Sequence, residues 1–220
     1  MRPRDELAAL GAFYGVAVDD TIDSHGAALD RYAEWVLGRD DLALVTLGGP
    51  ETLCRGVSPT AAARLRCAVA RWPAAITGIK LELTGQREPT LYVRAQCPWA
   101  DGVEWLTREV GAVAATLPPA RILYGLGFQG DVVKTYALAP DRFVSYRLDS
   151  AHVHPEHKDY RSEVAWTEVA WPDDRWAAIG GLGRTLGFRV AGHVGRASDT
   201  HALKVYVERT GGIPTDRSFA

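Results

Sequence analysis

Lysine and tyrosine recur two residues apart in segments that have the pattern of β-strands. The segment "DVVKTYALAP" (131–140) contains Lys134 and Tyr136, and "ALKVYVER" contains Lys204 and Tyr206. Successive side chains of a strand point to opposite faces, so each such pair shares a face. Lysine binds phosphate as a point charge, and a phenol ring attracts a cation to its face. One face of these strands could therefore hold an anion beside an aromatic wall.

The same alternation runs through six predicted strands and gives each an aliphatic face and a polar face. The polar faces carry Lys80 and Glu82, Tyr92 and Arg94, Lys134 and Tyr136, Arg147, Arg189 and His193, and Lys204 and Tyr206. An antiparallel sheet covered by helices on one side normally exposes a polar face to water, so a solvated surface is the alternative. Closure into a barrel would remove the sheet edges and make the polar face a lumen, whose cations would need an anionic guest.

Helices are predicted between pairs of strands. Ser58 and Pro59 give a typical helix start, and Pro118 ends another helical pattern. The predicted helices are 24–37, 58–72, 98–117 and 172–187, and the predicted strands are 42–47, 78–83, 90–97, 121–129, 131–138, 142–148, 188–195 and 202–209. Hairpins that alternate with helices exclude a parallel doubly wound sheet. We expect an α+β fold that forms a single domain over 1–220. It should contain one antiparallel sheet with helices on one face, and this sheet either stays open or closes into a β-barrel.

The strand segments K-T-Y (134–136), K-V-Y (204–206) and T-L-Y (90–92) resemble those of the ABBA, or PT-barrel, aromatic prenyltransferases. In that family, α-β-β-α repeats form an antiparallel barrel ringed by helices. Lumen lysines and arginines hold an allylic diphosphate there, and tyrosines shield its cation. The resemblance implicates Lys134, Tyr136, Lys204 and Tyr206, with Tyr92 and Arg94 as weaker matches.

By this resemblance, the protein is expected to transfer a prenyl group from an allylic diphosphate to an aromatic acceptor. No resident cofactor is expected, and a requirement for Mg²⁺ is neither expected nor excluded. Arg94, Arg147 and the two lysines would neutralise the diphosphate, and Glu82 would act as base or orient the acceptor. The expected partners are these small molecules, without nucleic acid or membrane. A non-catalytic module that binds an anion or aromatic ligand is the alternative. A homodimer could complete the barrel, because only three hairpins are clear in the sequence.

A histidine-rich segment offers a third hypothesis. "HVHPEHKDY" contains His152, His154 and His157 near Glu156 and Asp159. Imidazoles and carboxylates are ligands of zinc and iron. The spacing matches no HExxH element, and Pro155 disfavours a helix, so a surface loop and a metal-dependent enzyme both stay open.

Charge and cysteine content limit the classes of partner and compartment. The 220 residues carry a net charge of −2, with a pI near 6.3. This charge argues against bulk electrostatic binding to nucleic acid or an anionic membrane. The three cysteines are odd in number and lack CxxC spacing, which indicates a reducing compartment. No apolar run approaches the length of a membrane span. We therefore expect a cytoplasmic location.

Overall fold

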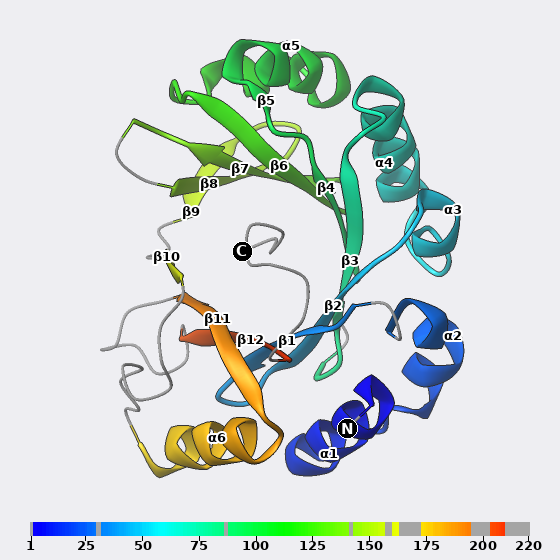
Figure 1. The fold of residues 1–220 in the computed structure, drawn as a ribbon. Helices are drawn as coiled ribbons and strands as arrows, with labels where there is room; N and C mark the ends of the chain where they lie inside the picture. Colours follow the sequence, from blue (N-terminus) through cyan, green and yellow to red (C-terminus); the bar gives the residue numbers. More distant parts are fainter. Residues whose placement is uncertain are drawn as a thin grey trace.

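The chain forms one strongly curved antiparallel sheet with helices on its outside (Figure 1). The computed structural model describes residues 2–29, 32–85, 88–140, 143–156, 160–162, 173–194 and 203–209. The strands are β1 Glu34–Gly38, β2 Leu42–Leu47, β3 Ile76–Glu82, β4 Thr90–Arg94, β5 Cys97–Pro98, β6 Ile122–Gln129, β7 Val132–Leu138, β8 Phe143–Leu148, β9 Val153–Glu156, β10 Tyr160–Ser162, β11 Phe188–Val194 and β12 Lys204–Arg209.

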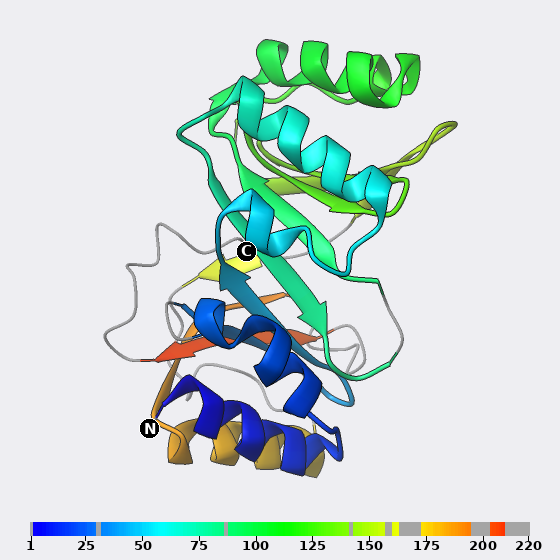
Figure 2. The same ribbon diagram turned by 90° about the vertical axis from the view of Figure 1, so that its right-hand side faces the viewer.

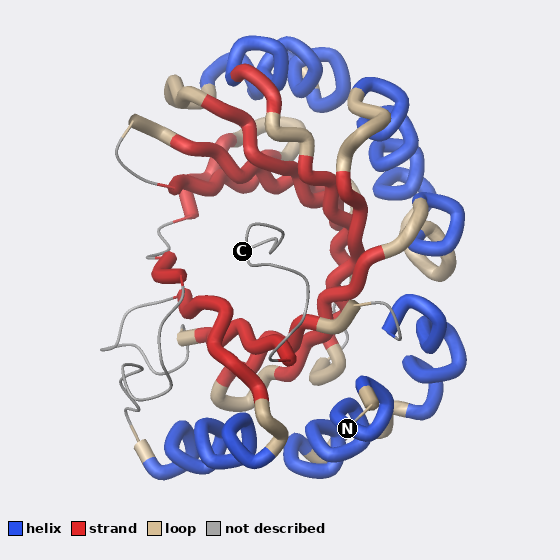
Figure 3. Tube along the Cα trace, viewed as in Figure 1, coloured by secondary structure: helices blue, strands red, loops and turns tan. Residues whose placement is uncertain are grey.

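The strand order is β10-β11-β12-β1-β2-β3-β4-β6-β7-β8-β9, with β5 paired to β6. Five hairpins make up most of this path: β1–β2, β3–β4, β6–β7, β8–β9 and β11–β12. The two end strands, β9 and β10, follow each other in the chain, and the curled sheet brings them to the same side of the ring (Figure 3). Within the described residues no ladder joins them, so the barrel-like sheet is not closed.

All the described helices lie outside the ring of strands (Figures 1 and 2). They are α1 Pro3–Tyr14, α2 Asp19–Leu29, α3 Pro50–Leu53, α4 Pro59–Arg71, α5 Trp99–Val110, the 3₁₀ helix η1 Ala112–Thr116 and α6 Asp174–Thr185. In the described residues, α4 packs on β4 and β6, α5 on β6, and α6 on β11. No described helix is long and apolar enough to cross a bilayer.

The hydrophobic core lies between the helices and the outer face of the sheet. Trp35, Ile79, Phe128 and Val205 come from four different strands, and each is fully buried in one continuous cluster with helix residues such as Leu65. This outer face is the predicted aliphatic face. The remaining alternate positions point to the inner, concave side of the curved sheet, which carries most of the predicted polar residues.

Two helix predictions are confirmed by their caps. The Ser58 hydroxyl accepts a hydrogen bond from the backbone N–H of Ala61 at the start of α4. The Asp173 carboxylate accepts one from the backbone N–H of Trp176 at the start of α6. Such side-chain oxygens satisfy N–H groups that have no partner within the helix.

The predicted helix over 24–37 is wrong in its second half. The structure has α2 end at Leu29 and β1 begin at Glu34. The apolar spacing that suggested a helix also fits a strand that is buried on both faces, with Trp35 in the main core and Val36 in a small inner cluster. The helix α1 was not predicted at all.

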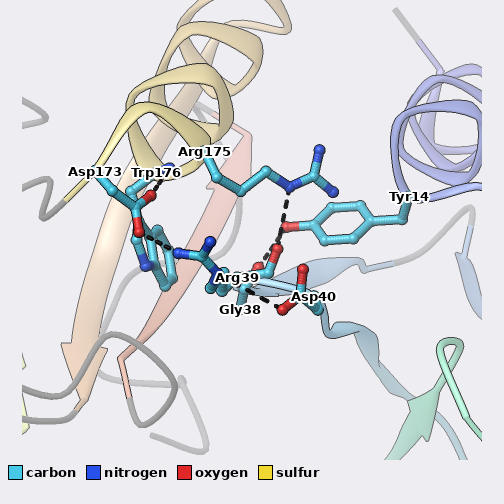
Figure 4. Close-up of polar contacts among 7 residues, drawn as sticks. All are labelled: Tyr14, Gly38, Arg39, Asp40, Asp173, Arg175 and Trp176. Atoms are coloured by element: carbon cyan, nitrogen blue, oxygen red, sulfur yellow. Dashed lines mark hydrogen bonds and ion pairs between the residues drawn. The ribbon is translucent and has the colours of Figure 1, made fainter.

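Polar contacts link the first described helix, the turn between β1 and β2, and the last described helix (Figure 4). Arg39, in the turn between β1 and β2, forms an ion pair with Asp173 at the start of α6. Arg175 Nε donates to the backbone oxygen of Arg39 at 3.3 Å, and the Tyr14 hydroxyl donates to the backbone oxygen of Gly38 at 2.8 Å. One turn of the sheet therefore holds both the first and the last described helix.

Candidate functional site

Four aromatic rings meet on the inner face of β4, β6, β7 and β8, and we call them the aromatic cluster: Tyr92, Tyr124, Tyr136 and Phe143. The rings of Tyr92 and Tyr136 have centroids 6.0 Å apart, and Tyr136 stacks with Phe143 at 6.4 Å. Tyr124 meets Phe143 edge-on at 5.5 Å. Tyr92 and Tyr136 are almost completely buried. Two of the predicted tyrosines therefore do share an aromatic wall.

Glycines of β6 allow these rings to approach each other. Tyr92 pairs with Gly127, and Tyr136 pairs with Gly125, so both glycines lie between the two tyrosines on the inner face. A Cβ on Gly127 would lie 3.2 Å from Cε1 of Tyr92 and 3.4 Å from Cβ of Lys134. A Cβ on Gly125 would lie 2.9 Å from the backbone oxygen of Val93. Glycine inside a strand commonly marks such a close approach.

Arg94 brings a positive charge to the aromatic cluster. Its guanidinium carbon lies 4.6 Å from the ring centroid of Tyr124, and its side chain is largely buried. In the amide orientation that satisfies both groups, the Gln96 side-chain oxygen accepts from Nε and Nη2 of Arg94, each at 3.0 Å. Arg94 and Gln96 also line a hollow of about 590 Å³, together with Arg71. A guanidinium that is fixed beside a hollow is suited to bind an anionic group.

Lys134 and Arg147 extend this charge along the inner face. They pair directly across β7 and β8, and Lys134 pairs with Gly127 on its other side. Lys134 is half-buried and Arg147 is exposed. The structure therefore brings five predicted residues into one region with the aromatic cluster: Tyr92, Arg94, Lys134, Tyr136 and Arg147.

A second group of polar residues lies further along the inner face, and we call it the carboxylate cluster: Glu34, Glu208, Tyr32 and Arg189. Glu34 on β1 pairs with Glu208 on β12, and Glu208 pairs with Arg189 on β11. The two glutamates are buried almost completely. The Tyr32 hydroxyl donates to Oε2 of Glu34 at 3.1 Å, and Arg189 forms an ion pair with Glu208.

Glu34 is the most perturbed carboxyl group of this cluster. Burial raises its pKa to about 7; the neighbouring Glu208 also raises the pKa, whereas the Tyr32 hydrogen bond and Lys80 lower it. Among the described residues, Oε1 of Glu34 is buried and has no hydrogen-bond partner. Burial also raises the pKa of Glu208, against the opposing effect of Arg189. A carboxyl that titrates near neutral pH and keeps one free oxygen can accept a proton.

Lys80 and Glu82 have different surroundings from those expected. Lys80 Nζ lies 2.6 Å from Oε1 of Glu82, and both side chains are largely buried. Glu82 also lines a hollow of about 210 Å³ beside α2. Glu82 therefore has an ammonium group as its ion-pair partner, whereas Oε1 of Glu34 has no hydrogen-bond partner among the described residues.

Three further predicted residues lie away from the aromatic cluster. Lys204 Nζ lies 3.5 Å from Oδ2 of Asp41, and Tyr206 packs on the small inner cluster of β1 and β2. The backbone of His193 pairs with Val205, after a register shift between Val190 and Gly192. The described residues do not include the side chain of His193.

Two of the three free cysteines have raised pKa values, which disfavour them as nucleophiles. Burial raises the pKa of Cys97 to about 11 and raises that of Cys54 as well. Cys67 is exposed on α4. The pKa values of the first two thiols keep them protonated near neutral pH, as expected for small buried hydrophobic residues.

Sequence reasoning missed Glu34, Tyr124 and the paired glycines for identifiable reasons. Glu34 lay inside the predicted helix 24–37, so no strand face was assigned to it. The irregularity of β6 between Leu123 and Gly125 interrupts the alternation at Tyr124. The segment "YGLGF" did carry a usable signal, because two glycines spaced by two in a strand leave room on one face.

No known protein-family model, curated protein or solved structure matches this chain. The function of the inner face is therefore inferred from its geometry.

Proposed function

We propose that the protein transfers a prenyl group from an allylic diphosphate to an aromatic acceptor on the inner face of the sheet. The observation that carries this proposal is the position of Arg94, which stacks on the aromatic cluster and lines a hollow of about 590 Å³. An allylic diphosphate needs a positively charged group, because its leaving group is an anion. It also needs aromatic rings, because its carbon skeleton becomes a cation.

The architecture supports the same proposal. Five antiparallel hairpins curl into a ring, and helices precede four of them in the chain. The resemblance to the PT-barrel prenyltransferases implies five helix–hairpin repeats around a lumen. The sequence analysis left open a homodimer that completes the barrel, because only three hairpins are clear in the sequence; the described residues of a single chain supply twelve strands in one sheet, and whether a second copy closes it stays a prediction.

The proposed reaction has three steps on the inner face. The C–O bond to the diphosphate breaks, and both electrons leave with the anion, which Arg94 and Lys134 neutralise. The allylic cation then lies against the rings of Tyr92 and Tyr136. A carbon of the acceptor ring bonds to the cation, and the ring regains aromaticity by losing a proton.

Glu34 is the proton acceptor in this scheme. Glu34 on β1 pairs with Val45 on β2, and Val45 pairs with Lys80 on β3. Lys80 in turn pairs with Thr90 on β4, which lies two residues before Tyr92. Three strand spacings of about 4.8 Å place the proton acceptor roughly 14 Å along the sheet from β4. For Glu34 to receive the proton, the acceptor ring must lie between the two clusters, with the carbon that bonds to the prenyl cation within reach of the Glu34 carboxylate.

The test is product formation by the purified protein. Dimethylallyl and geranyl diphosphate are each incubated with indoles, phenols and hydroxybenzoates, with and without Mg²⁺, and products are identified by mass spectrometry. Arg94→Ala should lower kcat by about a hundredfold, the usual effect of losing one group that stabilises developing negative charge. Arg108→Ala is the matched control, because Arg108 is an exposed residue of α5 paired only with a neighbouring glutamate among the contacts described.

Circular dichroism must show that Arg94→Ala is folded. Absence of product with every donor and acceptor, or equal activity of the Arg94→Ala and Arg108→Ala variants, would contradict the proposal.

One observation favours a non-catalytic alternative. Lys80, Arg189 and Lys204 each have a carboxylate partner, so the inner face is less cationic than its sequence suggests. A module that binds an aromatic ligand without chemistry would also use the aromatic cluster. Stoichiometric binding of an aromatic acceptor without turnover of any diphosphate would favour it. We also propose a reducing location such as the cytoplasm, in line with three free thiols.

A further inference from the structure

The turn between β8 and β9 gathers three metal-ligating side chains outside the aromatic and carboxylate clusters. Asp149, His152 and His154 each offer one ligand atom, and these atoms all lie within 4.8 Å of one another. The hairpin itself fixes their spacing, because Leu148 pairs with Val153 and Arg147 pairs with His154. The backbone N–H of Asp149 also donates to the carbonyl of His152 at 3.1 Å.

The distances between the ligand atoms suit a small tetrahedral ion. Nε2 of His154 lies 3.2 Å from Oδ2 of Asp149, and Nδ1 of His152 lies 3.7 Å from Oδ1. Zinc–ligand distances of about 2.0–2.1 Å imply roughly 3.3 Å between two ligands of a tetrahedral site. The two histidine rings have centroids 5.7 Å apart. Because the two nitrogens approach different oxygens of Asp149, side-chain rotation must bring one oxygen and both nitrogens, which lie within 4.8 Å of one another, to this spacing around a metal.

The carboxylate is already held in place by the backbone. Oδ1 of Asp149 accepts hydrogen bonds from the N–H groups of Ala151 at 2.9 Å and His152 at 2.8 Å. Hydrogen bonds of this kind orient a ligand before the metal arrives and limit the entropy lost on binding. The second oxygen, Oδ2, faces His154.

We propose that Asp149, His152 and His154 form a binding site for a divalent transition metal, with zinc as the best fit. Two imidazoles and one carboxylate favour zinc over magnesium or calcium, which prefer sites made only of oxygen ligands. Three protein ligands leave a fourth position for water or a ligand. His152 also lines a hollow of about 710 Å³ between η1 and β9, so a ligand of the metal has space beside it. This site is independent of the prenyl-transfer proposal.

The test uses the full chain without a histidine tag. Zinc is titrated by calorimetry in a buffer free of chelators, and cobalt is used as a spectroscopic probe, since tetrahedral Co²⁺ absorbs strongly in the visible range. We expect one zinc per chain, no comparable binding of Mg²⁺, and an affinity at least about tenfold weaker in His154→Ala. Asp149→Asn should weaken zinc binding similarly, because the amide oxygen can still accept the turn's N–H hydrogen bonds while one anionic ligand is lost.

Glu104→Gln is the control for the loss of one exposed carboxylate, since Glu104 pairs with Arg108 on α5. It should bind zinc as tightly as the unaltered protein. The proposal is overturned if His154→Ala and Asp149→Asn, both folded by circular dichroism, bind zinc like the unaltered protein. It is overturned equally if the unaltered protein binds no zinc or binds Mg²⁺ as well.

Discussion

At the scale of single residues, the two K-x-Y pairs are not equivalent. Lys134 and Tyr136 lie with the aromatic cluster, where Tyr136 contacts both Tyr92 and Phe143. Lys204, by contrast, has a carboxylate partner on the β1–β2 turn. The same K-x-Y spacing therefore gives two different environments, because the residues on the neighbouring strands determine which contacts each pair makes.

Glu34 should make the stability of the protein depend on pH in a defined direction. Its pKa rises from 4.5 to about 7 on folding, mainly through burial. A carboxyl with a raised pKa costs no stability below pH 4.5, where it is protonated in both states, and costs most above pH 7. The penalty is on the order of 3 kcal/mol. Unfolding free energy should therefore fall as pH rises from 4.5 to 7.

Glu34→Gln should remove this dependence. The amide oxygen can still accept from Tyr32, so the variant should exceed the unaltered protein in stability at pH 8 and match it more closely near pH 4.5. Urea denaturation at both pH values measures the difference. Glu104→Gln, which alters an exposed carboxylate, should show no such change. A Glu34→Gln stability gain that is equal at both pH values would show that Glu34 does not titrate as proposed.

At the scale of elements, the glycines of β6 determine whether the aromatic cluster can form. Gly127→Val places a branched side chain against Tyr92 and Lys134, where even a Cβ would be in tight contact. Such overpacking typically costs about 1–3 kcal/mol and moves neighbouring side chains. We expect lower stability in urea and a changed near-ultraviolet circular dichroism spectrum from the displaced tyrosines.

The matched control for this prediction is Gly181→Ala in α6. A Cβ at Gly181 meets nothing within 4 Å, and alanine is preferred over glycine in a helix by about 0.5–1 kcal/mol. This variant should be slightly more stable than the unaltered protein. If Gly127→Val were equally well tolerated and left the tyrosine spectrum unchanged, the close packing across β6 would be wrong.

Alternation and capping were sufficient to predict most elements from the sequence. Hairpins at 78–97, 121–138 and 188–209 stand where the pattern placed them, and the Ser58 cap begins α4 as expected. The strand β1 could not be recognised, because burial on both faces removes the alternation that identifies a strand. Side chains that meet on paired strands far apart in the sequence, such as Glu34 and Glu208, depend on a register that one sequence does not reveal.

At the scale of the whole molecule, the sheet joins the first and last described strands of the chain. Strand β12 pairs with β1 along five residue pairs, although about 170 positions separate them in the chain. On the outside, the Arg39–Asp173 ion pair joins the β1–β2 turn to α6. The first and last described strands are therefore neighbours in one sheet, and one continuous hydrophobic cluster joins residues of many of its strands.

This topology predicts that the protein unfolds as a single unit. The hydrophobic cluster runs from Leu7 on α1 to Val207 on β12, so loss of the last hairpin exposes core residues contributed by the first helices. Urea unfolding followed by tryptophan fluorescence and by far-ultraviolet circular dichroism should give coincident midpoints, the mark of a cooperative transition. Arg39→Ala should shift both midpoints equally to lower urea, because it weakens the connection between the two ends. Refolding should be slow, since the β1–β12 pairing closes a very long loop. Two separate transitions would show instead that part of the ring folds by itself, and the single-domain description would then be wrong.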